Sequence, residues 1–280
     1  MQVIRTAAEM REVRSGISGT VGLVATLGGI HAGHTVHMDT LRPQCDVLVG
    51  SLFLNPTQFN ANEDLSTYPA EEAADITEFE NHGVDILFAP PVEEMYPSTE
   101  VEEVPQVDPG PAAKFLDGEH RPGHFEGVAT VVARLFSIIS PNKTTFGEKD
   151  AQQLRIIQHI NETLELRIDI ITIPTVREPD GLALSSRNAY LSPDEREAAT
   201  ILFKALTVVK LSWDSGERSG EVLRFMMTAV LDGEPLATTE YASIADPDTF
   251  EELEQAEHSA RALLAVQIGS ARLIDNILLN

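Results

Sequence analysis

The chain has 280 residues, 42% of them hydrophobic, which is enough for one large domain or a domain and a half with a real core. Its 44 acidic residues outnumber 20 basic ones, and the formal charge of −24 makes a polyanion such as nucleic acid an unfavourable partner. The apolar runs are too short to span a bilayer, no secretory signal is evident, and a single cysteine permits no intrachain disulfide, so we expect a soluble cytoplasmic protein with no membrane partner.

The first elements are expected to form a β-α-β unit around a glycine-rich turn. A short helix is predicted at 7–13 and buried strands at 21–26 and 47–54. Between the strands, the sequence GLVATLGGIHAGH places glycines beside His31 and His34, at the point where a helix begins. A strand, a tight turn and a helix start bring backbone N–H groups up to a phosphate in parallel α/β proteins. The pattern therefore predicts a bound nucleotide.

The histidine pair has three interpretations. Residues at i and i+3 can present both imidazoles on one side of a helix start. Neighbouring carbonyls could satisfy them structurally, or they could bind a metal, although that needs a further ligand and the turn contains no Cys, Asp or Glu. The surrounding glycines favour the third interpretation, in which the imidazoles donate to nucleotide phosphates.

Polar side chains follow the second strand, at the end where parallel sheets bind their ligands. Asn55 and Gln58, in the turn NPTQF, are suited to hydrogen-bonding a hydroxyl or a carboxylate. The next elements are expected to be a polar loop able to serve as a lid at 60–69, a helix at 71–81, a strand at 84–89 and a loop or short hairpin at 90–111.

A second strand-to-helix turn carries charge. After a helix at 128–139 and a strand at 143–146, Lys149 is placed where it can act as a point charge on phosphate. Asp150 can cap the helix that begins near Ala151, or hold a ribose hydroxyl. Of the two glutamines that open this helix, one is expected to face the site and the other the surface.

The step Ile173–Pro174–Thr175 is the expected hinge to a second domain. There Ser185, Ser186 and Arg187 supply two hydroxyls and a guanidinium, a suitable set for β- and γ-phosphates. The remaining expectations are a capping box at 192–195 that starts a helix to about 211, a helix at 221–231, and short strands at 241–245 and 262–268. In the terminal motif at 272–276, the Arg and the Asp are expected to form structural pairs and not to catalyse.

Six motifs stand in the order and spacing of one family: GGIHAGH, FLNPTQF, GEHRPGHF, FGEKDAQQL, DGLALSSRNAYLS and ARLIDN. Over nearly the whole chain they resemble the pantothenate synthetases (pantoate–β-alanine ligases), within the nucleotidyltransferase superfamily that shares the HxGH turn. The resemblance implies the α/β fold class, with a Rossmann-like parallel-sheet domain at 1–174 that binds ATP and pantoate and a smaller α+β domain at 175–280 that carries the SSR phosphate loop. It also implies a homodimer, ATP with Mg²⁺, and two half-reactions: pantoate is adenylated with loss of pyrophosphate, and β-alanine then displaces AMP.

The resemblance assigns site residues position by position. It implies catalytic roles for His34, the family's proton donor, and for His31, Lys149 and Arg187. Pantoate is implied to bind Asn55, Gln58 and Gln153. The residues implied to bind ATP are Leu27, Gly28, Gly29, Ile30, His31, Ala32, Gly33, His34, Gly147, Glu148, Lys149, Asp150, Val176, Leu184, Ser185, Ser186 and Arg187. The metal ligands are unknown, and Asp75 matches an acidic position associated with magnesium.

The chain departs from the family pattern at Ala25, Leu27, Thr57 and Ala70, where the family usually has Pro, Met, Met and Arg. Leucine keeps the shape of methionine, whereas loss of proline loosens the turn and Thr57 changes the pantoate pocket. Two other functions stay open. The chain could adenylate another small carboxylic acid, or it could be a nucleotide-binding regulator with weakened catalysis.

Overall fold

A computed structural model describes residues 1–60, 63–97 and 106–280, and the chain divides into two compact units. The first unit comprises Met1–Ala113, Asp117–Glu148 and Gln153–Ile173, and the second comprises Lys114–Leu116, Lys149–Gln152 and Pro174–Asn280. Residues 61–62 of the predicted lid and 98–105 of the predicted loop or hairpin lie outside the described residues. Among the described helices, none combines the length and the apolar character that a bilayer crossing requires.

A six-stranded parallel sheet forms the centre of the first unit, in the order β1-β4-β3-β2-β5-β6. The chain runs from β2 through β3 to β4 and then crosses to β5 on the other side of β2. The order therefore reverses between β2 and β5, and sheets of this type bind ligands outside the carboxyl ends of the strands at such a point. The strands are β1 (Gln2–Ile4), β2 (Val21–Thr26), β3 (Val47–Leu52), β4 (Ile86–Phe88), β5 (Lys143–Gly147) and β6 (Asp169–Ile173).

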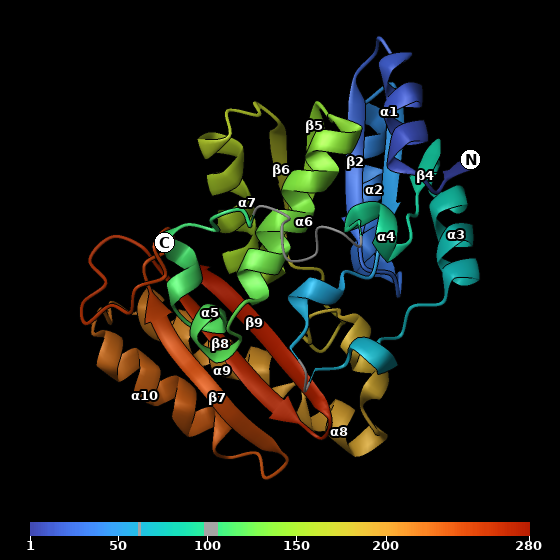
Figure 1. The fold of residues 1–280 in the computed structure, drawn as a ribbon. Helices are drawn as coiled ribbons and strands as arrows, with labels where there is room; N and C mark the ends of the chain where they lie inside the picture. The colour runs from blue at the N-terminus through green and yellow to red at the C-terminus, as the bar shows by residue number, and fades with distance from the viewer. Residues whose placement is uncertain (61–62, 98–105) are drawn as a thin grey trace. The chain divides into compact units, whose positions relative to one another are not determined.

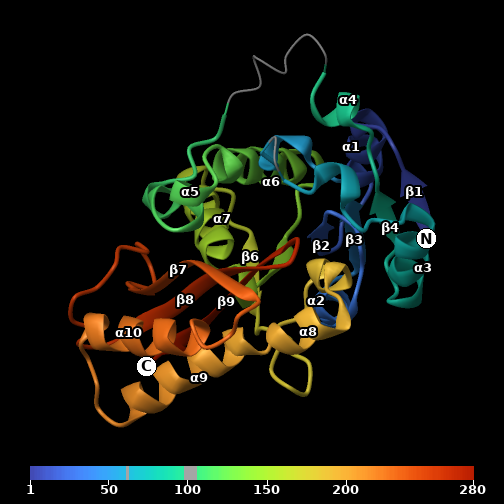
Figure 2. The same ribbon diagram turned by 90° about the horizontal axis from the view of Figure 1, so that it is seen from below.

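Helices cover both faces of this sheet (Figures 1 and 2). Right-handed crossovers place α2 and α3 on one face and α1, α6 and α7 on the other. Helix α6 begins one turn before its predicted start and is buried along most of its length. The helices of this unit are α1 (Ala7–Ser15), α2 (Ala32–Leu41), α3 (Glu72–Asn81), α4 (Val92–Met95), α5 (Asp117–His120), α6 (His124–Ile139) and α7 (Ala151–Thr163).

The core between β3 and α3 depends on a missing side chain. A Cβ atom at Gly50 in β3 would lie 2.7 Å from the ring of Phe79, which is fully buried. Burial of such a side chain contributes roughly 1.5 to 3 kcal/mol. Glycine therefore lets α3 pack closely on the sheet, and α3 carries Asp75, the acidic residue that holds the glycine-rich turn.

The second unit is α+β. Its antiparallel sheet has the order β7 (Ala237–Ala245), β8 (Ala260–Ile268) and β9 (Ala271–Leu279), and helices α9 (Ile201–Asp214) and α10 (Gly220–Leu231) pack on it (Figure 2). The fully buried side chains that these elements share include Leu206, Met227, Ile244 and Leu264. Together the two units confirm the predicted fold class.

Several elements differ from the sequence prediction. Strand β3 ends at Leu52, two residues early, because Asn55 caps a 3₁₀ turn at Pro56–Gln58. The predicted helix from 193 is two helices, α8 (Pro193–Ala198) and α9, and the Thr200 hydroxyl donates to the Glu197 carbonyl at the break. Strands β1, β6 and β9 were not predicted, and the terminal motif at 272–276 lies inside β9.

Candidate active site

The two histidines of the glycine-rich turn cap helix α2 reciprocally. The Gly33 N–H donates to His31 Nδ1 at 3.0 Å, and the His31 N–H donates to His34 Nδ1 at 3.3 Å. A backbone N–H can only donate, so each Nδ1 carries a lone pair and each neutral ring carries its proton on Nε2. The ring centroids are 4.1 Å apart. Both imidazoles are therefore Nε2–H donors at a helix N-terminus, where the helix dipole favours an anion.

Asp75 holds the glycine segment of the same turn. Its Oδ2 accepts from the Gly29 N–H at 3.0 Å and its Oδ1 from the Ile30 N–H at 2.8 Å. These two backbone donors, which the sequence pattern directs at a phosphate, are taken by a buried carboxylate. The backbone donors of Gly29 and Ile30 are therefore used within the protein, in holding the turn on α3.

Gly28 is required where Asp75 meets the turn. Its φ is 103°, and an added Cβ would lie 2.7 Å from the Ala70 Cβ and 2.9 Å from Asp75 Oδ2. Ala70 also lines a cavity of about 250 Å³ beside the turn, together with Leu27 and Asp75. The small residue at position 70, where the family usually has arginine, is thus part of the packing around the turn.

The start of the GEKD motif lies beside the histidine helix. Strands β2 and β5 are paired at Gly22–Lys143 and Leu23–Thr144, near their amino ends. At the carboxyl end of β5, a Cβ atom added at Gly147 would lie 3.6 Å from Nε2 of His37 in α2. Within the first unit, the glycine-rich turn and Gly147 thus lie at the switch point of the sheet, where the strand order reverses between β2 and β5.

Gln58 is held by helix α6 on its backbone side. His124 Nδ1 donates to the Gln58 carbonyl at 2.7 Å, and Arg121 donates to His124 Nε2 at 2.9 Å. Burial, with the nearby Arg121 charge, lowers the pKa of His124 to about 4, so the ring is neutral and this donor assignment follows. The backbone of Gln58 is therefore fixed by a neutral histidine.

The Arg121 guanidinium is itself held by a carboxylate. It donates from Nε and Nη2 to the two oxygens of Glu63, at 2.8 and 2.7 Å. Burial raises the pKa of Glu63, but the hydrogen bonds and charge of Arg121 outweigh it and keep that pKa below its usual range. The GEHRPGHF motif thus supplies structural partners for the turn that carries Gln58.

One of the two glutamines at the start of α7 differs from the expectation. Gln153 is half-buried and belongs to the first unit. Gln152, expected on the surface if its neighbour faces the site, is buried and donates to the Phe115 carbonyl at 2.9 Å. The Gln152 amide is therefore used within the protein, and Gln153 is the better candidate for binding a substrate.

In the second unit, Val176 and the SSR loop are adjacent. The Leu184 N–H donates to the Val176 carbonyl at 2.9 Å, and Ser185 caps the following 3₁₀ turn by accepting from the Arg187 N–H at 3.3 Å. The structure therefore brings together Val176 and the loop of Leu184 to Arg187.

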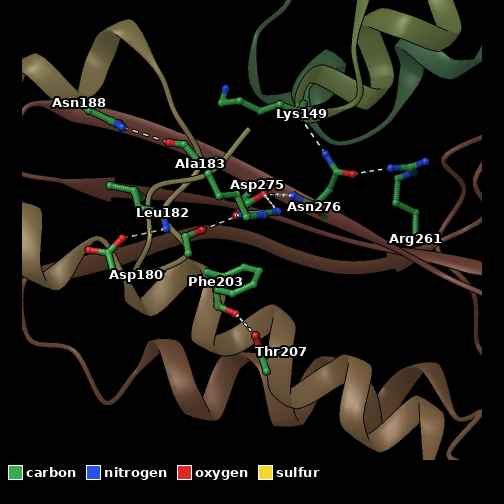
Figure 3. A network of polar contacts seen from close by, with 12 residues as sticks. Lys149, Asp180, Leu182, Ala183, Asn188, Phe203, Thr207, Arg261, Asp275 and Asn276 are labelled. Carbon is green, nitrogen blue, oxygen red and sulfur yellow. Dashed lines mark hydrogen bonds and ion pairs between the residues drawn. The ribbon is translucent and has the colours of Figure 1, made fainter. Parts of the chain in front are cut away.

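The terminal strand β9 holds Lys149 by its backbone (Figure 3). Asn276 Nδ2 donates to the Lys149 carbonyl at 2.8 Å, while the Lys149 ammonium lies 3.7 Å from Asp150 Oδ1. Figure 3 shows the Lys149 side chain extending away from this network. The cation is thus anchored by its main chain, and its side chain is directed elsewhere.

The Arg and Asp of the terminal motif form structural ion pairs, as predicted. Asp275 is buried and accepts two hydrogen bonds from Arg177, at 2.6 and 2.8 Å, and Arg272 pairs with Glu240 at 2.8 and 2.9 Å. Sequence reasoning gave Asn276 no role. The sequence signal for a role was the adjacent polar pair Asp275–Asn276 within an otherwise largely apolar strand.

The predicted site residues fall into two groups, one in each unit. The first unit holds the turn at 27–34, Asn55, Gln58, Gly147, Glu148 and Gln153. The second holds Lys149, Asp150, Val176 and the loop at 184–187. Among the described residues, no group of three or more His, Cys, Asp or Glu side chains is arranged to hold a metal ion.

A parallel sheet whose order reverses beside a glycine-rich turn, with two histidines capping the next helix, defines a nucleotide-binding α/β protein. Residues 2–278 match the model of the pantoate–β-alanine ligase family, and the chain belongs to this family. A pantothenate synthetase from Roseiflexus sp. (strain RS-1) is 49% identical over 279 residues, covering 100% of this chain and 99% of the relative.

Solved structures agree with this assignment. A crystal structure of pantothenate synthetase from Thermus thermophilus is 40% identical with a TM-score of 0.92, covering 99% of both chains. The pantoate–β-alanine ligase of Francisella tularensis, in complex with β-γ ATP and β-alanine, is 32% identical with a TM-score of 0.81, covering 99% of this chain and 97% of that one.

Proposed function

We propose that this chain condenses pantoate with β-alanine to give pantothenate, converting ATP to AMP and pyrophosphate. The observation that carries the proposal is the family match over residues 2–278, together with a 49% identical pantothenate synthetase that the chain covers almost completely. The Nε2–H donors of His31 and His34 at the switch point suit a triphosphate, and Gln58 after the neighbouring strand β3 suits a small acid.

In the first half-reaction, a pantoate carboxylate oxygen attacks the α-phosphorus of ATP. The bond from that phosphorus to the bridging oxygen breaks, and pyrophosphate leaves with the electron pair. Negative charge spreads over the phosphate oxygens, so catalysis requires positioned donors and cations more than a covalent nucleophile. We assign this role to His34, Lys149 and Arg187, and single donors of this kind contribute about 2.7 to 4 kcal/mol in the transition state.

In the second half-reaction, the neutral amine of β-alanine attacks the acyl carbon of pantoyl adenylate. The bond to the phosphate oxygen breaks, AMP leaves, and the new amide loses a proton. AMP is a good leaving group and needs no strong acid. We therefore assign His34 as a neutral Nε2–H donor, in agreement with the backbone hydrogen bond that its Nδ1 accepts.

Magnesium is proposed to enter with ATP, held by phosphate oxygens and water. Both oxygens of Asp75 already accept backbone N–H groups, so this residue fits a role in holding the turn better than one as a metal ligand. A homodimer, a hinge at Ile173–Pro174–Thr175 between domains at 1–174 and 175–280, and a cytoplasmic location remain part of the proposal. The single cysteine suits a reducing compartment.

The test is pantoate-dependent exchange of labelled pyrophosphate into ATP. We expect exchange that requires magnesium and pantoate, and pantothenate on addition of β-alanine. Folded protein that binds ATP but gives no exchange with any acid would contradict the proposal and select the regulator. Exchange that requires a different carboxylic acid would select a related adenylating enzyme.

A further inference from the structure

The side chain of Asn55 is saturated by the protein. This residue is fully buried, and its Oδ1 accepts from the Thr57 N–H at 3.3 Å, the Thr57 hydroxyl at 3.0 Å and the Tyr96 hydroxyl at 2.9 Å. Its Nδ2 donates to Gln58 Oε1 at 3.1 Å and to the Gly127 carbonyl at 3.3 Å. A flipped Asn55 amide would place Nδ2 against the Thr57 N–H and so is excluded.

The orientation of Asn55 determines what Gln58 offers to a ligand. Because Gln58 Oε1 accepts from Asn55, a flipped Gln58 would place two NH₂ groups against each other. The end of the Gln58 amide that is not used by Asn55 is therefore Nε2, which can only donate. A substrate group bound there must be an acceptor, such as a carboxylate oxygen or a hydroxyl lone pair.

The chain holds this arrangement from several elements. Tyr96 follows α4 and is 4% exposed, and Gly127 comes from α6. Thr57 is one of the departures from the family pattern, in which methionine has no hydroxyl to donate. In this chain, Thr57 therefore has two donors for Asn55: its backbone N–H and its hydroxyl.

We infer that Tyr96 and Thr57 are positioning residues for the acid substrate: their hydroxyls fix the Asn55 amide, and Asn55 fixes Gln58 so that it presents only N–H donors. Asn55, predicted to bind pantoate directly, acts through Gln58. The inference rests on the proposed function for the identity of the acid. The polarity of Gln58 rests on the hydrogen bonds alone.

The kinetic test compares KM for pantoate with KM for ATP in the pyrophosphate exchange assay. Tyr96→Phe and Thr57→Val each remove one hydroxyl, and we expect KM for pantoate to rise about 3- to 10-fold with KM for ATP unchanged. Thr57→Ser keeps the hydroxyl and should restore the wild-type KM. Asn55→Asp replaces the Nδ2 donor with an acceptor, so Gln58 should flip and KM for pantoate should rise further.

Thr77→Val is the matched control, because the Thr77 hydroxyl bonds within α3, to the Ala73 carbonyl. It should leave both constants unchanged. If the wild type is active and both hydroxyl deletions leave KM for pantoate unchanged, the inference is overturned. An equal rise in both KM values would also overturn it, because that result indicates a general structural defect.

A second measurement needs no substrate. In the ligand-free protein, side-chain NH₂ exchange measured by NMR should show the Asn55 protons, which are hydrogen-bonded and fully buried, more strongly protected than those of Gln58, which is 8% exposed. Tyr96→Phe should speed Asn55 exchange several-fold. Protected Gln58 protons with exposed Asn55 protons would overturn the inference, even if the proposed acid proved wrong.

Discussion

His31 and His34 show why histidine, and not a more common cap, begins helix α2. Serine, threonine and aspartate are the usual N-cap residues because their oxygens accept backbone N–H groups. Aspartate would also place a negative charge beside the proposed phosphate. An imidazole accepts with Nδ1 and still donates with Nε2, so one side chain caps the helix and presents a donor to an anion.

We predict that His34→Ala slows adenylation by about 10²-fold or more, because it removes one phosphate donor in the transition state. The measurement is the rate of pantoate-dependent pyrophosphate exchange at saturating substrates. His82→Ala removes a histidine that pairs with Asp39 on the surface and should keep the wild-type rate. A His34→Ala rate close to wild type would remove this residue from the mechanism.

His124 makes the stability of the protein depend on pH. Its pKa is about 4 in the folded protein and 6.5 when unperturbed, so below pH 6.5 the unfolded chain binds a proton that the folded chain does not. The free energy of unfolding therefore falls as the pH decreases from 6.5 to 4, by up to roughly 3 kcal/mol, and is unaffected by this group above that range.

Urea unfolding at a series of pH values tests this. His124→Gln should reduce the pH dependence between 6.5 and 4, whereas His258→Gln, which removes an exposed histidine, should not. An unchanged slope in the His124 variant would show that other groups dominate acid unfolding.

At the scale of elements, the close approach of α6 to the turn at Pro56–Gln58 depends on Gly127. A Cβ atom there would lie 2.5 Å from the Thr57 carbonyl oxygen and 2.9 Å from the Gln58 nitrogen. These are backbone atoms, so neither helix nor turn can relieve the overlap by a rotamer change. The glycine in GEHRPGHFEG is therefore as necessary to the acid site as the polar residues around it.

Gly127→Ala should lower the free energy of unfolding by about 1 to 3 kcal/mol through overpacking, and should raise KM for pantoate. Urea unfolding and the exchange assay measure the two effects. Ser137→Ala, at an exposed position of the same helix, should change neither. A fully stable Gly127→Ala variant would mean that α6 and the turn are not as close as described.

The hydrogen bond from Asn276 in β9 to the Lys149 carbonyl should also affect activity. Asn276→Ala removes the donor to the Lys149 carbonyl, together with the oxygen that accepts from Arg261, so the ammonium should be less well placed on the proposed phosphate. We expect the exchange rate to fall about 5- to 10-fold, as for the loss of one neutral hydrogen bond. Asn280→Ala, at the exposed C-terminus, is the control. An unchanged rate would show that β9 supports the fold alone.

The elements that could be predicted were those with strong local signals. Strand β2 was recognised at its observed limits from its apolar run, and the Ser192 capping box marks the start of α8. Strand β1 has three residues, too few for a periodic pattern, and the break at Ala199–Thr200 contains neither proline nor glycine. Long-range partners such as Tyr96 for Asn55 depend on tertiary packing, which spacing along the chain does not encode.

At the scale of the whole molecule, the net charge of −24 opposes folding through self-repulsion. We predict that Tm rises by several degrees as salt is increased from low to moderate concentration, because the Debye length falls from about 30 Å at 0.01 M to about 8 Å at 0.15 M. Differential scanning calorimetry in NaCl and KCl measures this, and both salts should act alike. A Tm that falls with salt would indicate that attractive ion pairs outweigh the repulsion.

The one-sided polarity of Gln58 also has a consequence for inhibitor design. A compound directed at the proposed acid site should place a sulfonyl oxygen or an aromatic ring nitrogen against this residue, since both are pure acceptors. An analogue with an N–H at the same place would face two amide hydrogens and lose affinity, which makes a matched pair of such compounds a direct probe of selectivity.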